Sequence, residues 1–389
     1  MILVLAPLPP LRTGIAIYSQ KLYSEVGKRI SVSIIANKGA KSEQFKVIET
    51  WKFESVFSIF HIIKEVCRNR RRVVHMQLGY TLIRDPIYTQ IATIILLLIL
   101  KILKTKTIIT LHGVITKETL RGYLNTKKGL QKFLISLVHG AYIIYYKLLL
   151  HLSDIIIVHN NLIKDKLIAL ANFQNKNKVV VIPHGVDIPP ERRELKKEEK
   201  LNILFTGFIR KTKGIEDFLK ALEILRKRKK SNFKVTIAGA IHIRDDVNYY
   251  RRIRELAKKY RLHDIVEFKV RFIPEEELQE IIHKADIIVL PYKDFFYEAS
   301  GVLARLMGYG KAIICTNIPK FAAELKHGKD AIIVPVGNPV VLADAIYQLM
   351  TNSRLRERLG LNLKGKAKDR MWGKIAERHI VVYYKSLLN

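Results

Sequence analysis

The chain has 389 residues, which is long enough for two domains of ordinary size. Hydrophobic residues make up 49% of it and aromatic residues 9%, so a globally disordered protein is excluded. Its 68 lysines and arginines against 35 acidic residues give a formal net charge of +33, which indicates an anionic partner or surface.

Three explanations of this charge stay open: a nucleic-acid partner, an anionic membrane face, and the charged surface of a protein from a hot environment. The chain has no zinc-finger spacing, no RNP-like aromatic motif and no basic low-complexity tail, which disfavours nucleic acid. The densest basic cluster, Arg68 with Arg70–Arg72, is predicted to be a solvated helix end.

The cysteines and the amino-terminal residues indicate the cellular compartment of the protein. Cys67 and Cys315 lie in apolar or helical contexts, so we expect two buried thiols rather than a disulfide framework or a metal cluster. Residues 1–6 are a short apolar run without a basic start, so no secretory signal is expected. Both features predict a cytoplasmic protein.

Short β-branched runs alternate with longer helical patterns along the whole chain. In the first half the runs are residues 2–5, 32–36, 73–77, 107–111, 154–159 and 178–182. In the second half they are residues 202–206, 234–238, 265–269, 286–290, 311–316 and 331–335. Such runs between helices are typical of buried parallel strands, because crossover helices cover both faces of the sheet. The two series predict two doubly wound α/β domains.

A linker is expected at residues 187–200, which are charged, marked by prolines and without an apolar period. The first domain would then span residues 1–186, and the second would begin at residue 201. Doubly wound domains bind ligands at the carboxyl ends of their strands, so the active site is expected in the cleft between the two domains.

Two turns in the second half have the features of an anion site. Residues 206–214 lie between a strand and a helix and carry Arg210 and Lys213. Residues 297–302 follow another strand and carry Glu298. At such glycine-containing turns, free backbone N–H groups and the positive helix end attract phosphate oxygens. Cations beside a carboxylate that can bind hydroxyl groups suit a sugar nucleotide.

The first half contributes a loop and a histidine at strand ends. Gly14 follows a proline-rich turn after the first strand, where a backbone without a side chain can approach a ligand closely. His112 ends the strand 107–111 and is expected at the same rim. His184 is expected to be a hydrogen-bonded loop residue, and Asp245–Asp246 a solvated loop.

Together these segments resemble the two-domain GT-B architecture of glycosyltransferase family 4, a large family of retaining enzymes. The motifs that carry the resemblance are the proline-glycine loop, Thr-Leu-His-Gly (110–113), Ile-Pro-His-Gly-Val-Asp (182–187), Gly-Phe-Ile-Arg-Lys-Thr-Lys-Gly-Ile (207–215), Ser-Gly-Val-Leu (300–303) and Gly-Lys-Ala-Ile-Ile (310–314). The resemblance implies two Rossmann-like domains: an acceptor-binding domain before the linker and a nucleotide-sugar domain at 201–366. It also implies a terminal helix at 367–389 that crosses back onto the first domain.

The resemblance further implies roles for single residues. Arg210 and Lys213 would hold the donor diphosphate and offset the charge that develops on it as it departs. Glu298 would contact donor-sugar hydroxyls, and His112 would lie near the anomeric carbon and help to stabilise the transition state. The other donor-binding positions are Gly14, Gly207, Phe272, Ile273, Ser300, Gly301 and Val302.

Two positions depart from the family pattern. The second glutamate of the family, which normally binds the donor ribose, falls on Arg305. The arginine that usually follows the glycine of the phosphate motif is replaced by Phe208, while Arg210 offers a guanidinium from a shifted position. Both changes fit a variant subgroup of the family. No Asp-x-Asp motif is present, and the resemblance implies neither a metal nor a cofactor.

The acceptor is less visible in the sequence. Residues 87–103 and 133–150 are apolar, and we expect them to form helices of the first domain that are buried over most of their surface. A sharper hypothesis is that one face of these helices contacts lipid while nearby lysines and arginines bind anionic headgroups.

Three functional classes follow. The first is a retaining hexosyltransferase, of mannose or glucose type, that uses a nucleotide-diphosphate sugar and a lipid-linked or polysaccharide acceptor. The second is a GT-B enzyme of other chemistry, such as a nucleotide-sugar epimerase or a phosphorylase. The third is a basic protein that binds nucleic acid or membrane without catalysis. The motif order favours the first class.

Overall fold

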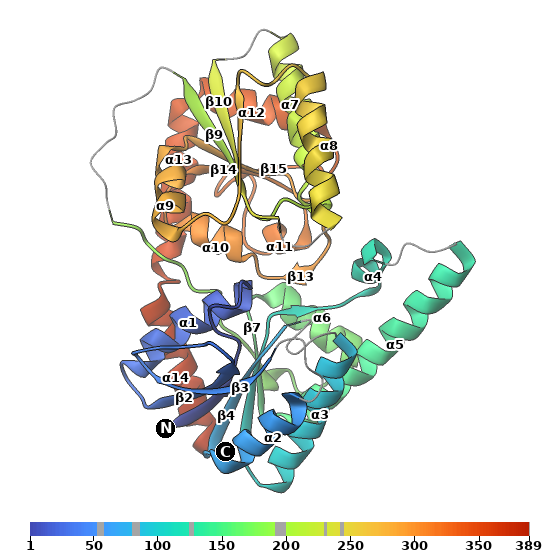
Figure 1. The fold of residues 1–389 in the computed structure, drawn as a ribbon, viewed down its shortest axis with the longest axis vertical. Coiled ribbons are helices and arrows are strands. Elements are labelled where there is room, and N and C mark those ends of the chain that lie inside the picture. The colour runs from blue at the N-terminus through green and yellow to red at the C-terminus, as the bar shows by residue number, and fades with distance from the viewer. Residues whose placement is uncertain are drawn as a thin grey trace. The chain divides into compact units, whose positions relative to one another are not determined.

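The computed structural model describes residues 1–52, 58–79, 86–123, 128–190, 200–228, 232–241 and 245–388. Most of the expected linker, residues 191–199, lies outside these ranges. The chain divides into two compact units (Figure 1). Unit 1 comprises Met1–Gly185, Phe296–Ala299 and Arg370–Asn389, and unit 2 comprises Val186–Phe295 and Ser300–Asp369.

Unit 1 is built on a parallel sheet with the strand order β3-β2-β1-β4-β5-β7-β8. Its strands are β1 (Ile2–Leu5), β2 (Val32–Asn37), β3 (Lys46–Trp51), β4 (Val73–Leu78), β5 (Lys106–Leu111), β7 (Ile155–Val158) and β8 (Val179–Val181). In β1, Leu3 pairs with Ser33 of β2 on one side and with Val74 of β4 on the other. The chain order reverses there, so the loops after β1 and β4 flank the crevice where doubly wound sheets bind ligands.

Helices cover the sheet of unit 1. They are α1 (Gly14–Gly27), α2 (Ser58–Arg68), α3 (Pro86–Ile102), α4 (Lys117–Tyr123), α5 (Lys128–Leu152), α6 (Asn161–Ala171), the 3₁₀ turn η1 (Lys176–Lys178) and α14 (Trp372–Leu388). The carboxyl-terminal helix α14 packs against α1, and Arg29 of α1 forms an ion pair of 2.9 Å with Glu377 of α14.

A two-stranded antiparallel ladder joins distant parts of the sequence in unit 1. The strand β6 (Gly113–Val114) pairs with β13 (Tyr297–Glu298). Residues 296–299 lie inside the sequence range expected for the second domain, yet they belong to unit 1 because of this pairing.

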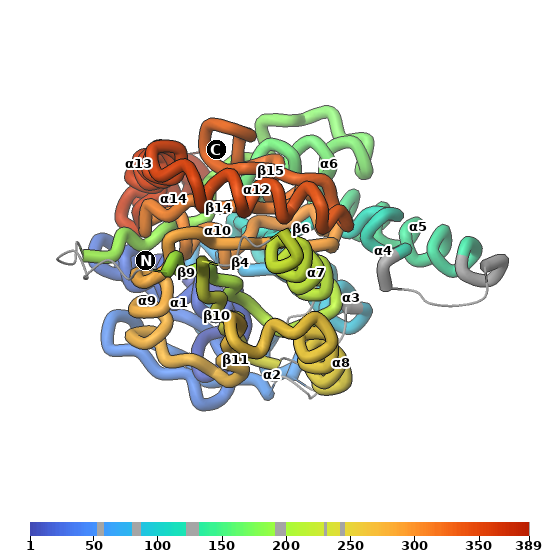
Figure 2. The backbone as a smooth tube through the Cα atoms, turned by 90° about the horizontal axis from the view of Figure 1, so that it is seen from above, coloured from blue at the N-terminus to red at the C-terminus, as the bar shows by residue number. Residues whose placement is uncertain are grey.

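Unit 2 is a second parallel sheet, with the strand order β11-β10-β9-β12-β14-β15. Its strands are β9 (Leu201–Thr206), β10 (Phe233–Gly239), β11 (Val266–Val270), β12 (Ile287–Leu290), β14 (Ala312–Thr316) and β15 (Ile332–Val334). Its helices are η2 (Lys211–Lys213), α7 (Ile215–Lys227), α8 (Asp245–Lys259), α9 (Glu275–Lys284), α10 (Gly301–Met307), α11 (Pro319–Ala322), α12 (Pro339–Thr351) and α13 (Ser353–Lys368). Helix α7 lies between α8 and α12 on one face (Figure 2).

The predicted α/β class with two Rossmann-like parallel sheets is confirmed. Each of the twelve predicted strand segments contains a strand, and the central ones are buried along their length because helices cover both faces. The expectation of two buried thiols is wrong for Cys67, which is exposed on α2, and right for Cys315, which is buried in β14.

The apolar helices of unit 1 are less buried than expected. By length and composition, the Lys132–Leu152 part of α5 could cross a membrane, and only 33% of that window is buried. A core helix of a soluble protein can pass the same test. Both α3 and α5 bury one face against the sheet or each other and expose apolar residues on the opposite face.

Candidate functional site

The phosphate-type turn of unit 2 forms as the sequence predicts, between β9 and α7. Gly207 follows β9 with φ +138°, and Gly214 precedes α7 with φ +66°, both conformations that favour glycine. Between them, Arg210 and Lys213 lie at the two ends of the 3₁₀ turn η2.

This turn packs against the loop that follows β12. A Cβ atom on Gly214 would lie 1.9 Å from the Pro291 carbonyl oxygen, so a side chain there would push the two loops apart. The Lys293 N–H donates to the Thr212 carbonyl at 2.8 Å and holds them together. Strands β9 and β12 are neighbours at the point where the chain order of the sheet reverses, so both loops lie at the ligand-binding crevice of unit 2.

The two predicted cations are paired with carboxylates at this crevice. Arg210 Nε lies 3.6 Å from Asp246 Oδ2, and Lys213 Nζ lies 3.3 Å from Asp294 Oδ2. The sequence predicts a solvated loop for Asp246, and this prediction is wrong. Asp246 lies at the start of helix α8 and is buried, because it neutralises Arg210.

Asp294 is shared between two lysines. Lys320 Nζ lies 2.8 Å from its Oδ1 atom, and Lys213 Nζ also lies 3.7 Å from the centre of the Tyr292 ring. Burial alone would raise the pKa of Asp294, but Lys320 and Lys213 hold it below its ordinary value. The carboxylate stays ionised and contacts both lysines.

The second predicted turn begins helix α10. The Ser300 hydroxyl oxygen accepts a hydrogen bond from the Leu303 N–H at 3.2 Å and caps the helix. Gly301 and Val302 are the first helical residues, whose N–H groups have no partner inside a helix. Phe272 and Ile273 lie in the loop after the edge strand β11, and Phe272 is exposed.

Arg305, at the position of the missing glutamate, forms an ion pair of 3.3 Å with Glu275 at the start of α9. Both side chains are partly exposed. The substitution therefore replaces a carboxylate by a cation that is already paired with an acid of a neighbouring helix.

Gly14 is the first residue of α1 in unit 1. The Thr13 hydroxyl oxygen caps the helix by accepting from the Ala16 N–H at 3.1 Å. A Cβ atom on Gly14 would meet nothing within 4 Å, so this glycine borders open space at the carboxyl end of β1.

His112 lies at the centre of a polar network in unit 1. Its Nδ1 atom lies 3.1 Å from His159 Nε2, and the Gln77 amide bridges His112 Nε2 at 2.8 Å and the Tyr23 hydroxyl at 2.7 Å. His159 Nδ1 faces the Ile182 carbonyl at 3.1 Å and must donate to it.

Burial keeps these histidines neutral. Desolvation lowers the pKa of His112 well below its ordinary value, and neighbouring histidines lower it further. Desolvation also lowers the pKa of His159 to about 3 and the pKa of His379, on α14, to about 4. His184 joins the cluster by ring contacts with Tyr18 at 5.0 Å and Trp372 at 5.5 Å. His112 therefore acts as a neutral hydrogen-bonding group at neutral pH.

The ladder of β6 and β13 brings Glu298 next to this histidine. Glu298 pairs with Gly113, the residue that follows His112 in the chain. Two of the residues predicted to be catalytic, 186 positions apart in sequence, are thus one residue apart in the backbone pairing of unit 1.

Sequence reasoning missed the partners of the predicted residues. Gln77 and His159 end the strands on either side of β5, and Asp294 follows β12 by four residues. The rule that ligands bind at strand carboxyl ends would have selected all three. The sequence contains no comparable pattern that would have selected Lys320. No group of three metal-binding side chains occurs within the described ranges.

Comparison with known families agrees with this architecture. Residues 187–366 match the family described as glycosyl transferases group 1, and residues 12–189 match glycosyltransferase family 4. The two matches together cover most of the chain. The chain belongs to the GT-B glycosyltransferases of the family 4 type.

Among curated relatives, a D-inositol 3-phosphate glycosyltransferase of Paenarthrobacter aurescens is 29% identical over 195 residues, covering 47% of this chain and 46% of the relative. An uncharacterised glycosyltransferase of Methanocaldococcus jannaschii is 26% identical over 226 residues, covering 54% of each chain. The chain thus spans about half the length of the curated relatives it matches.

Solved structures share the fold at low identity. Anabaena Alr3699/HepE, determined in complex with UDP, superposes with a TM-score of 0.74 at 12% identity, and 99% of each chain is covered. Sucrose-phosphate synthase of Thermosynechococcus elongatus gives a TM-score of 0.76 at 15% identity, with 100% of this chain and 99% of the other covered. These likenesses show the GT-B fold.

Proposed function

We propose that this protein is a retaining, metal-independent hexosyltransferase that moves a mannose- or glucose-type sugar from a nucleotide-diphosphate sugar to a lipid-linked or polysaccharide acceptor. The observation that carries the proposal is the position of Arg210 and Lys213 at the ligand crevice of unit 2. Structures of similar fold with bound UDP and UDP-glucose, and the glycosyltransferase names of the relatives, support it.

The cationic turn supplies what glycosyl transfer needs at the donor. When the glycosidic bond to the diphosphate breaks, negative charge builds up on the departing oxygen, and fixed cations in a poorly hydrated site stabilise that charge best. Lys213 is held by Asp294, which keeps Lys320 as a second cation, so Lys213 can turn to a phosphate without leaving the carboxylate unpaired. The amides of Gly301 and Val302 add donors.

Unit 1 contributes a neutral histidine, a carboxylate and a glycine. His112 offers hydrogen bonds without a positive charge, because burial lowers its pKa. Glu298, paired with Gly113, offers a carboxylate that can accept hydroxyl hydrogens of a sugar. Gly14 leaves room for backbone approach to the ligand.

A thermal-shift panel of nucleoside diphosphates tests the donor assignment. Stabilisation of the wild-type chain by one or more nucleotides, lost in the Arg210→Ala/Lys213→Ala variant, supports it. A panel in which no nucleotide raises the melting temperature contradicts it.

Two further measurements test the reaction type. The anomeric configuration of the product, observed by NMR, tests whether the enzyme retains the configuration of the donor sugar. Turnover in the presence of a chelator tests metal independence.

The proposed location is the cytoplasm, with peripheral contact to the inner face of an anionic membrane. The support is an exposed apolar row along one face of α3, spaced three or four residues apart: Ile87, Ile91, Ile95, Leu98 and Ile102. A second row on α5 comprises Phe133, Leu137, Ile144 and Leu148. An interfacial helix inserts such a row while cations nearby bind headgroups.

Flotation with anionic vesicles tests this contact. Wild-type protein should float with the vesicles at low salt, and Ile91→Ser/Ile95→Ser should remain at the bottom of the gradient. Substitutions on the buried face of α3 would unfold the helix and cannot serve as a control. The control is instead the exposed polar pair Lys258→Ser/Lys259→Ser on α8, and this variant should still float. A wild-type chain that never floats contradicts the contact.

A further inference from the structure

Unit 1 contains a large cavity beside the β5, β7 and β8 part of its sheet. Its volume is about 910 Å³, and it is lined by the starts of β5 and β7, the strand β8 with Ile182 after it, the ends of α3 and α5, and one face of α14. The carboxyl end of β5, where His112 lies, is about 17 Å away along the strand. Lys106, at the start of β5, is therefore remote from His112, whereas the lining continues along β8 to Ile182, whose carbonyl oxygen faces His159 Nδ1 at 3.1 Å.

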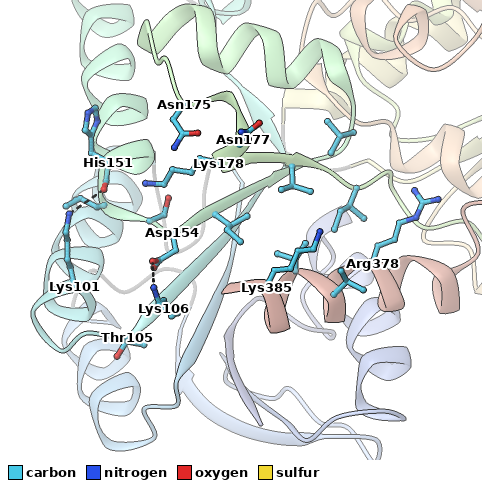
Figure 3. A pocket seen from close by; sticks show the side chains of 18 of the residues that line it. Lys101, Thr105, Lys106, His151, Asp154, Asn175, Asn177, Lys178, Arg378 and Lys385 are labelled. Carbon is cyan, nitrogen blue, oxygen red and sulfur yellow. Dashed lines mark hydrogen bonds and ion pairs between the residues drawn. The ribbon is translucent and has the colours of Figure 1, made fainter. Parts of the chain in front are cut away.

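The lining of this cavity is strongly basic. Six cations contribute to it: Lys101, Lys104, Lys106, Lys178, Arg378 and Lys385. Asp154 is the one acidic residue among the lining residues. Figure 3 shows Lys106 and Asp154 on the strand side of the cavity, with Arg378 and Lys385 extending from α14 across from them.

Most of this charge is not neutralised by the protein. Lys106 Nζ lies 3.5 Å from Asp154 Oδ1, while Asp154 Oδ2 accepts from the Thr107 N–H at 2.7 Å. Lys101 Nζ reaches only a carbonyl oxygen, that of His151 at 3.5 Å. Within the described residues, no acid lies within ion-pair distance of Lys104, Arg378 or Lys385. A net charge that stays in a concave site attracts anions, because the walls exclude part of the solvent.

Lys101, Lys104, Arg378 and Lys385 are exposed, and local structure constrains two of the six cations, Lys104 through its backbone and Lys178 through partial burial. Lys104 follows α3 with φ +51°, a left-handed conformation at a helix end where glycine is the usual residue. Lys178 is partly buried, and desolvation lowers its pKa, with Asp154 opposing the shift and Lys101 adding to it. A bound anion would offset the free-energy cost of burying the charged Lys178 side chain.

We propose that this cavity binds a ligand that carries a diphosphate or two closely spaced phosphate groups. One phosphate would need only one or two of the cations, whereas the five that do not pair with Asp154 match a multiply charged group. Asn175 and Asn177 add side-chain amides at the rim, and Val180, Val181 and Val382 form an apolar wall for the rest of the ligand. The ligand is either a soluble diphosphate compound or a lipid headgroup of the same chemistry.

Pyrophosphate tests the soluble source. Calorimetric titration is made with the full chain carrying Arg210→Ala/Lys213→Ala, so that the donor crevice does not contribute and the result does not depend on the proposed transferase activity. We expect binding that weakens about tenfold or more when Arg378→Ala/Lys385→Ala is added, because charge-assisted hydrogen bonds are lost. Both side chains are exposed on α14, so the fold should survive their truncation.

Two further variants keep the test specific. Arg378→Lys/Lys385→Arg retains the charge and should keep most of the affinity. Lys258→Ala/Lys259→Ala removes the same charge from α8 and should leave the affinity unchanged. If the α8 variant weakens binding as much as the α14 variant does, the effect is general electrostatics and the proposal is wrong.

Vesicles test the lipid source. Phosphatidylcholine vesicles with and without cardiolipin, which carries two phosphates, are compared by flotation with the same variants. Cardiolipin-dependent flotation that is lost in Arg378→Ala/Lys385→Ala and kept in the α8 variant assigns the site to a headgroup. The proposal is overturned if neither pyrophosphate nor cardiolipin binds in a way that depends on Arg378 and Lys385.

Discussion

Lys213 Nζ lies 3.3 Å from the Asp294 carboxylate, so the cation expected to hold the donor diphosphate is paired before any ligand arrives. The pairing is not exclusive, because Lys320 Nζ lies closer to the same carboxylate, at 2.8 Å. Asp294 thus holds Lys213 over the Tyr292 ring while it also pairs with Lys320. Different consequences follow for the two lysines.

Lys213→Ala should abolish most turnover while leaving the fold intact. The Lys213 side chain is 14% exposed and Asp294 keeps Lys320, so the variant leaves no unpaired buried charge. Loss of a cation that acts on the leaving group should lower kcat/KM about 10²–10³-fold. Lys211→Ala, an exposed neighbour in the same turn, is the matched control and should be nearly as active as wild type. Equal activity of both variants would rule out the assigned role.

Lys320→Ala should instead act on stability. The Lys320 side chain is 2% exposed and its Nζ atom makes the shorter contact with the buried Asp294. Removing it should lower the free energy of unfolding by about 3 kcal/mol, because a buried carboxylate loses its main partner. Chemical denaturation of Lys320→Ala and Lys213→Ala side by side measures the difference. A smaller loss for Lys320→Ala than for Lys213→Ala would show that the assignment of structural and functional cation is reversed.

Gly214→Ala should disrupt the donor turn through steric overlap. A Cβ atom on Gly214 would lie 1.9 Å from the Pro291 carbonyl oxygen, whereas one on Gly328, which has a similar φ of +71°, would meet nothing within 4 Å. Gly328→Ala should therefore cost only the left-handed backbone strain, about 1 kcal/mol. Gly214→Ala should cost more and also weaken nucleotide binding in a thermal-shift assay. Similar melting temperatures for both variants would mean that the two loops at the crevice are not packed as described.

Acid should destabilise the protein through its buried histidines. The pKa values of His159 and His379 in the folded state, about 3 and about 4, lie below the ordinary value of 6.5. The unfolded chain therefore binds more protons, and stability is lost as pH falls from about 6.5 towards these values. Each histidine contributes a slope of up to about 1.4 kcal/mol per pH unit in that window.

His379→Leu isolates one of these contributions. His379 is fully buried, its Nδ1 atom lies 2.9 Å from the Ile375 carbonyl oxygen, and its Nε2 atom has no hydrogen-bond partner in the described part of the chain, so leucine removes the titration together with that one hydrogen bond. The free energy of unfolding, measured between about pH 7 and pH 4.5, should fall less steeply for the variant than for wild type. Parallel pH profiles would show that His379 is not neutral in the folded state.

The parallel strands of both sheets could be predicted because their residues are buried on both faces and read as continuous apolar runs. The edge strand β3 (Lys46–Trp51) could not, since exposure along most of its length breaks the run. The strands β6 and β13 have two residues each, and their pairing depends on a contact between residues 113 and 298 that no local pattern encodes.

For the candidate site, the sequence predicts residues that are proposed to contact the ligand but does not predict the acidic residues that pair with them. Arg210 and Lys213 stand in a recognisable turn, but Asp246 follows another aspartate in a polar stretch and Asp294 stands alone before two phenylalanines, and neither context predicts a buried acid. Their burial appears only when the fold brings a cation to each. The basic cavity of unit 1 combines the starts of β5 and β7 and the strand β8 with the carboxyl-terminal helix, so its lysines are scattered in the sequence and could not be predicted as one site.

The most direct test of the proposed function is release of nucleoside diphosphate from a panel of nucleotide sugars, compared between wild type, Lys211→Ala and the Arg210→Ala/Lys213→Ala variant. We predict release from at least one donor by wild type and Lys211→Ala, and a loss of at least about 10²-fold in the double variant at unchanged folding. Undiminished release by the double variant would contradict the role of the cationic turn in glycosyl transfer.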